Sequence, residues 1–182
     1  MGSRGAPVIV ITGAMAAGKS TVAQGLAERL PRAAHVRGDV FRRMIVSGRE
    51  EVTPAAAAGA TAQLWLRYRL AAAAADGYAR AGFTAVLQDV VLGPDLTRYL
   101  DLLTARPRFA VVLAPPPDVL AERDRRRGKR GYGAWTAQAL DASLRSGTPR
   151  RGLWLDTGSQ TPDETITEVL ARLPEARWDR DG

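Results

Sequence analysis

The feature that most constrains this chain is a glycine-rich loop set between an apolar run and a helix-forming segment. Residues 7–12 read PVIVIT, a short β-branched run typical of a buried strand. Residues 13–20, GAMAAGKS, follow at once with the spacing G-x-x-x-x-G-K-S. Residues 18–30 favour a helix that ends before Pro31. A strand, a glycine turn and a helix in this order predict the first unit of a parallel α/β sheet.

The loop has the chemistry of a phosphate cradle. Glycines let the backbone wrap tightly, so that successive N–H groups point at phosphate oxygens, and the helix N-terminus adds a partial positive charge. Lys19 can reach the terminal phosphates, and the Ser20 hydroxyl can ligate Mg²⁺. The segment resembles the P-loop of proteins that bind nucleoside triphosphates. The alternative is a chance glycine turn. The residues expected to bind the nucleotide are Gly13, Ala14, Met15, Ala16, Ala17, Gly18, Lys19, Ser20 and Thr21.

Alternating strands and helices are predicted along the rest of the chain. Further strands are expected at 34–37, 84–87, 109–113 and 153–155, and helices at 40–47, 53–80, 94–105, 118–127 and 161–173. The fold class is therefore α/β: a three-layer P-loop NTPase fold whose five-stranded parallel sheet carries helices on both faces. Residues 1–182 are expected to form one domain, with a short arginine-rich lid at about 118–133 and a frayed tail at about 174–182.

Composition excludes several classes of function. The chain has no cysteine, which removes disulfides, thiolate metal sites and cysteine nucleophiles, and its single histidine argues against poly-histidine metal sites. No apolar run approaches the ~20 residues of a membrane span, and the first is too short for a signal peptide, so we expect a cytoplasmic protein. The net charge is +7, and arginine supplies 24 of the 26 basic residues. Residues 122–151 hold most of this excess, either as a solvated face or as a site for polyanions.

The chain is similar to the compact P-loop kinases of the nucleoside-monophosphate-kinase group, and within them to the chloramphenicol phosphotransferase-like family. The resemblance runs from Val8 to about Leu173. It rests on GAMAAGKS (13–20), HVRGDVFRRM (35–44), VLQDVV (86–91), AERDRRRGKRG (121–131) and LWLDT (153–157). It implies ATP, Mg²⁺ and transfer of the γ-phosphoryl group to a hydroxyl of a small molecule, of which an antibiotic such as chloramphenicol is only one representative. By the same resemblance, residues 157–162 border the adenine ring.

The resemblance also assigns roles to charged residues. Asp39 follows the expected second strand, where this family carries its catalytic aspartate, so it is the candidate base and acceptor contact. Its alternative role is a helix cap. Asp89, at the end of the third expected strand, either serves Mg²⁺ or contacts the acceptor, with a loop cap as the alternative. Arg42 is a candidate acceptor contact. The candidate catalytic arginines of the lid are Arg123, Arg127 and Arg130, which would join Lys19 in neutralising charge on the transferred group.

Three functions remain open from the sequence. The first is an ATP-dependent kinase for a small hydroxylated molecule, with gluconate-, shikimate- or nucleoside-like metabolites as near alternatives to an antibiotic. The second is a polynucleotide 5′-hydroxyl kinase, but no alternation of aromatic and basic residues predicts a stacking platform, so we expect no nucleic-acid partner. The third is a nucleotide-dependent switch protein without an acceptor. The sequence leaves the oligomeric state open and predicts no membrane partner.

Overall fold

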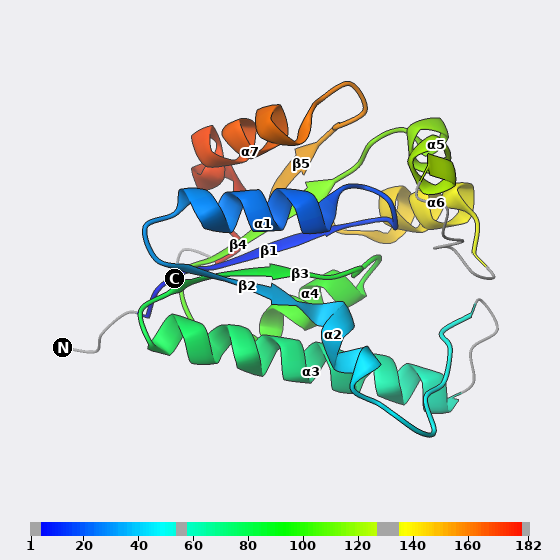
Figure 1. Ribbon diagram of the computed structural model, residues 1–182, viewed down its shortest axis with the longest axis horizontal. Coiled ribbons are helices and arrows are strands. Elements are labelled where there is room, and N and C mark those ends of the chain that lie inside the picture. The colour runs from blue at the N-terminus through cyan, green and yellow to red at the C-terminus, as the bar shows by residue number, and fades with distance from the viewer. Residues whose placement is uncertain (1–4, 54–57, 127–134, 180–182) are drawn as a thin grey trace.

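The computed structural model describes residues 5–53, 58–126 and 135–179. The described residues build one sheet of five parallel strands in the order β2-β3-β1-β4-β5, which confirms the predicted fold class (Figure 1). The strands are β1 (Val8–Gly13), β2 (Ala33–Arg37), β3 (Thr84–Gln88), β4 (Arg108–Leu113) and β5 (Leu153–Leu155). The helices are α1 (Lys19–Arg29), α2 (Gly38–Arg43), α3 (Ala58–Arg80), α4 (Asp95–Asp101), α5 (Pro117–Arg126), α6 (Ala137–Gly147) and α7 (Pro162–Ala171), followed by the 3₁₀ turn η1 (Leu173–Ala176).

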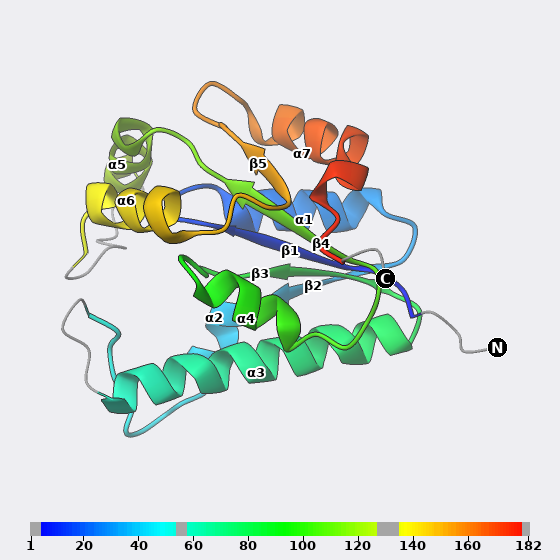
Figure 2. The same cartoon turned by 180° about the vertical axis from the view of Figure 1, so that it is seen from behind.

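Helices cover both faces of the sheet. In Figure 1, α1 and α7 lie on one face, and α3 lies on the other; the reverse view in Figure 2 shows α4 beside α3. Alternating side chains of β1 supply both cores: Val8 and Val10 pack with α3 and α4, whereas Ile9 and Ile11 pack with α1 and α7. All six residues of β1 are buried, as expected for the central strand of a parallel sheet. The described helices are all too short or too polar to traverse a lipid bilayer.

The sheet order places the functional edge. β1 lies between β3 and β4, and the carboxyl ends of the strands point toward α2, α5 and α6 (Figure 1). Arg37 of β2 pairs with Gln88 of β3, and Gln88 pairs in turn with Ile11 of β1. The ends of three strands therefore lie side by side next to the glycine loop that follows β1, where open α/β sheets bind ligands.

Two predicted helices end four residues earlier than expected. The helix expected at 40–47 spans Gly38–Arg43, so it begins directly at the end of β2. The helix expected at 94–105 ends at Asp101, because the buried carboxylate of Asp76 accepts the backbone N–H groups of Thr104 and Ala105 at 2.9–3.1 Å and so turns the chain away from α4. The long helix is predicted to start at 53–54, but residues 54–57 lie outside the described part of the chain. The structure describes this helix from Ala58 onward.

Two further features were not predicted. Helix α6 was missed: it begins at the Thr136 cap, whose hydroxyl accepts the N–H of Ala139 at 3.0 Å, and it buries Leu140 and Leu144. The frayed tail is wrong for 174–179, because Trp178 is buried and Asp179 is bound to Arg108. Residues 180–182 lie outside the description. The C-terminal segment is held by packing against distant parts of the chain, which no local pattern signals, whereas α6 had local signals in its Thr136 cap and its amphipathic pattern.

Candidate active site

The phosphate loop adopts a conformation that its glycines make accessible. Gly13 has φ +146° and Gly18 has φ +93°, both in the region that favours glycine. A Cβ on Gly13 would lie 2.3 Å from the carbonyl oxygen of Leu113 in β4. The first residue of the loop therefore packs directly on the backbone of the neighbouring strand. Ala16 also has a positive φ, +65°, which is strained for a residue with a side chain and typical of ligand-binding turns.

The start of α1 fits an anionic group. Gly18 occupies the N-cap position without a side-chain cap, and the first turn contains no acidic residue. The helix dipole and the N–H groups of this turn are therefore available to a phosphate. Lys19 is 8% exposed and its Nζ donates to the carbonyl oxygen of Ala14 at 2.7 Å, which keeps the ammonium over the loop. The Ser20 hydroxyl donates to Oε1 of Gln88 at 3.3 Å, which joins the loop to the end of β3.

A cavity of about 260 Å³ lies on one side of the phosphate loop. Its wall joins the loop to α5 and to the segment that follows β5. Residues 157–162, predicted to border an adenine ring, contribute Thr157, Gln160 and Pro162, and Arg123 donates from Nη2 to the carbonyl oxygen of Thr157 at 2.8 Å. The structure thus brings Thr21 and Arg123 to the same hollow, whereas Arg127 and Arg130 lie outside the described residues.

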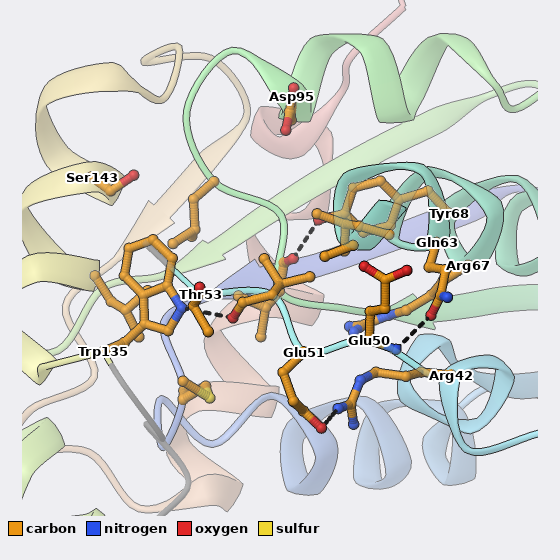
Figure 3. Close-up of a pocket in the computed structure, with 17 residues that line it drawn as sticks. Arg42, Glu50, Glu51, Thr53, Gln63, Arg67, Tyr68, Asp95, Trp135 and Ser143 are labelled. Carbon is orange, nitrogen blue, oxygen red and sulfur yellow. Dashed lines mark hydrogen bonds and ion pairs between the residues drawn. The ribbon is translucent and has the colours of Figure 1, made fainter. Parts of the chain in front are cut away.

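A second, larger cavity of about 650 Å³ opens on the other side of the loop (Figure 3). Figure 3 shows a polar side, with Arg42, Glu50, Glu51 and Gln63, and Trp135 across from it. Met15 of the phosphate loop forms part of the wall. The remaining lining residues are Val52, Thr53, Ala60, Leu64, Arg67, Tyr68, Val90, Leu92, Asp95, Leu140 and Ser143.

Asp39 lies in the first turn of α2. Arg37 occupies the N-cap position and no side chain caps the helix, so the alternative role of Asp39 as a cap is wrong. Its Oδ2 accepts from Arg43 at 2.6 Å, and its Oδ1 lies 3.5 Å from Nε of Arg37. Oδ1 is shielded from solvent and accepts no hydrogen bond within the described part of the chain. Asp39 is not among the residues that line the larger cavity, and its role in catalysis stays a prediction.

Asp89 is buried and turned toward Arg67 of α3. Nε of Arg67 donates to Oδ2 at 3.0 Å, Nη2 forms an ion pair with Oδ1, and the N–H of Val90 donates to Oδ1 at 2.7 Å. The carboxylate packs against the Cα of Gly38, where a Cβ would lie 1.9 Å from Oδ2. The predicted roles of Asp89 toward Mg²⁺ or the acceptor remain predictions, but both of its oxygens already bind groups of the protein.

Burial sets the ionisation of the groups around this ion pair. Desolvation is the largest cause that lowers the pKa of Arg67, and it is the largest cause that raises the pKa of Tyr68. Tyr68 therefore remains neutral, and its hydroxyl donates to the carbonyl oxygen of Val90 at 2.8 Å. Val91, which follows Val90, is held by Thr12, whose hydroxyl donates to the carbonyl oxygen of Val91 at 2.7 Å. The segment after β3 is thus held from both sides.

Of the predicted acceptor contacts, only Arg42 lines the larger cavity, where it pairs with Glu51. Sequence reasoning missed Arg67, Glu50 and Trp135. Arg67 had a weak signal: Gln63, Leu64, Arg67 and Tyr68 recur at the spacing of one helical face. Glu50 and Trp135 had none, because the segments that carry them have no regular pattern.

Comparison with protein families gives one match. The model of the AAA domain family matches residues 8–150, which contain the phosphate loop and four of the five strands. No curated protein matches the sequence.

Solved structures share the fold across nearly the whole chain. A sugar kinase from Janibacter sp. HTCC2649 has 22% identity and a TM-score of 0.65, covering 94% of this chain and 96% of that one. The APS kinase of Mycobacterium tuberculosis, in complex with AMPPNP and APS, has 18% identity and a TM-score of 0.69, with coverage of 93% and 98%. The tunicamycin resistance protein of Deinococcus radiodurans has 18% identity and a TM-score of 0.62, with coverage of 96% and 99%. At such identities the likeness shows a kinase-like P-loop fold.

Proposed function

Because the chain belongs to the AAA domain family, we propose that it uses its P-loop as an ATP-dependent O-phosphotransferase acting on a hydroxyl of a small molecule. One observation carries this proposal: a single loop separates two cavities. Ala16, Ala17 and Gly18 line the smaller cavity, and Met15 lines the larger one. A nucleotide whose base occupies the smaller cavity extends its phosphates over the loop toward the larger cavity. An acceptor in the larger cavity then faces the terminal phosphate.

The chain supplies positioning and charge neutralisation, which are the main demands of phosphoryl transfer. The first turn of α1 binds the phosphates, and the Lys19 ammonium moves from the Ala14 carbonyl to phosphate oxygens. The Ser20 hydroxyl is the protein group that fits Mg²⁺, which when bound neutralises charge on the phosphates. Arg123, at the edge of the smaller cavity, approaches the nucleotide from α5.

Asp39 is the proposed base. Its carboxylate accepts the proton of the acceptor hydroxyl as the oxygen attacks the terminal phosphorus, and ADP leaves. Arg43 and Arg37 contact this carboxylate and hold it near the end of β2. The acceptor class spans sugars and other metabolites, and antibiotics; the similarity to a tunicamycin resistance protein supports including the latter.

The test is acceptor-stimulated ADP release. Purified protein with ATP and Mg²⁺ is screened against sugars, polyols, nucleosides and hydroxylated antibiotics, and the phosphorylated product is identified by mass spectrometry. Asp39→Asn should lower kcat by about 10²–10⁴-fold while ATP binding stays within a few-fold of wild type. Arg43→Gln is the matched control, because it removes the ion pair and leaves the carboxylate.

Three outcomes contradict the proposal. Equal losses in Asp39→Asn and Arg43→Gln would assign Asp39 to holding α2 rather than to proton transfer. ATP binding with no acceptor-stimulated ADP release across the panel would favour a nucleotide-dependent switch protein. Salt-sensitive binding of oligonucleotides with phosphorylation of their 5′ ends would favour a polynucleotide kinase instead.

A further inference from the structure

Among the described residues that line the larger cavity, two are cations, Arg42 and Arg67, and each forms an ion pair with a carboxylate. Arg67 is bound through two nitrogens to Asp89, whose side chain is fully buried, while the Arg67 side chain is only 14% exposed. Arg42 pairs with Glu51 at the rim of the same cavity. Each arginine therefore offers hydrogen-bond donors to a ligand without offering a net positive charge.

Carboxylates outnumber these cations. Glu50 also lines the cavity; its carboxylate lies against the backbone of Gly59 at the start of α3, and no ion-pair or hydrogen-bond partner binds this carboxylate within the described residues. Asp95 lines the cavity as well, and its oxygen lies 3.7 Å from the exposed guanidinium of Arg98. Asp95 is therefore compensated by Arg98, whereas the unpaired Glu50 carboxylate would repel an anionic ligand.

Arg67 retains donors for a neutral ligand. A guanidinium has five N–H groups in a planar fork, and Asp89 engages the nitrogens Nε and Nη2. Nη1 has no partner within the described residues, and Arg67 lines the cavity. The bidentate grip of Asp89 fixes the plane of the fork, so Nη1 is presented without further loss of side-chain freedom.

The wall opposite is suited to an apolar body. The Trp135 indole is fixed in place because its Nε1 donates to the carbonyl oxygen of Val52 at 3.1 Å, across 83 residues of sequence. Leu140 and Leu92 line the same cavity. A ligand that fills it therefore meets a rigid aromatic and aliphatic surface on one side and hydrogen-bonding groups on the other.

We propose that this cavity selects an uncharged, hydroxyl-bearing acceptor with an apolar part, and that Arg67, positioned by Asp89, donates a hydrogen bond to an acceptor oxygen. Acceptors that carry a carboxylate or phosphate are rejected. This inference rests on the proposed function, since it assigns the acceptor class of the same site. Asp89 acts through Arg67 and is a positioning residue.

The experiment uses acceptor pairs that differ by one negative charge and keep the same carbon skeleton and hydroxyl groups: gluconamide and gluconate, and methyl shikimate and shikimate. Binding is measured by calorimetry with AMPPNP and Mg²⁺ present, and turnover by ADP release. In wild type the neutral member of a pair should bind and react at least tenfold better than the anionic one. Glu51→Gln and Asp89→Asn each restore a net charge to one arginine, and should shift that preference at least threefold toward the anionic member.

Controls separate folding from selection. The double variant Arg67→Met/Asp89→Asn removes both buried charges together, so it should fold but bind neutral acceptors at least tenfold more weakly, with AMPPNP affinity unchanged. Glu175→Gln removes a carboxylate from an exposed ion pair in η1 and should leave the preference unchanged. An anionic member that is preferred by wild type overturns the inference and leaves the kinase proposal intact. Failure of every pair to bind or react counts against both.

Discussion

The phosphate loop offers a matched pair of glycines that separates backbone strain from steric overlap. Gly13 and Gly18 both have positive φ, +146° and +93°. A Cβ on Gly18 would contact nothing within 4 Å, whereas one on Gly13 would lie 2.3 Å from the carbonyl oxygen of Leu113. Gly13→Ala and Gly18→Ala therefore carry a similar conformational cost, and only the first adds a clash with the backbone of a core strand.

The size of each effect follows from these contacts. A non-glycine residue in the left-handed region costs about 1–2 kcal/mol, which is the whole expected loss for Gly18→Ala. At Gly13 the carbonyl of Leu113 has to move by roughly 1 Å, which weakens the last pairing between β1 and β4 by about 1–3 kcal/mol. The total for Gly13→Ala is about 2–5 kcal/mol. For a chain of this length about 1 kcal/mol lowers Tm by roughly 2–4 °C.

Thermal unfolding by circular dichroism, with and without ATP and Mg²⁺, measures both variants. Gly18→Ala should lower Tm by about 2–8 °C, and Gly13→Ala by about 4–20 °C. Wild type should gain stability from saturating ATP, about 2.7 kcal/mol at a hundredfold excess over Kd, and Gly13→Ala should lose most of that gain. Equal Tm values for the two variants, or a wild-type Tm for Gly13→Ala, would refute the contact with Leu113 as the reason for glycine at this position.

The remaining predictions concern two carboxylates that bind distant parts of the chain. Asp76→Ala should lower the free energy of unfolding by about 1–3 kcal/mol in urea, because it removes the acceptor of the partly buried N–H groups of Thr104 and Ala105; an unchanged midpoint would contradict this. Asp179→Asn should cost about 1–2 kcal/mol at pH 7. Burial acts to raise the Asp179 pKa, but hydrogen bonds from Arg108 outweigh it and hold that pKa below its usual 3.8, so the carboxylate stabilises the fold above this pH. The gap between variant and wild type should close as pH falls through the lowered pKa, and a constant gap would show that charge is not involved.

Local signals were enough to predict the framework of the protein. The spacing of Gly13, Gly18 and Lys19 predicted the loop, and the strand at 153–155 has the predicted bounds. Thr161 and Glu164 form a capping box at the start of α7, in which the side chain of each residue binds the backbone N–H of the other. These features depend on residues a few positions apart, so the sequence itself contains the whole interaction.

Only the tertiary structure decided which residues contact one another in the candidate site. Asp89 was recognised as a carboxylate at a strand end, but its partner Arg67 lies 22 residues earlier in a helix that crosses the sheet. Trp135 meets Val52 across 83 residues, and these contacts create the larger cavity and set its charge. A periodic pattern reports which face of an element is buried, but it cannot report which distant residue will face it. The sequence thus determined that the chain builds a P-loop kinase-like fold, while the packing of α3, α6 and residues 50–53 determined the shape and charge of the larger cavity.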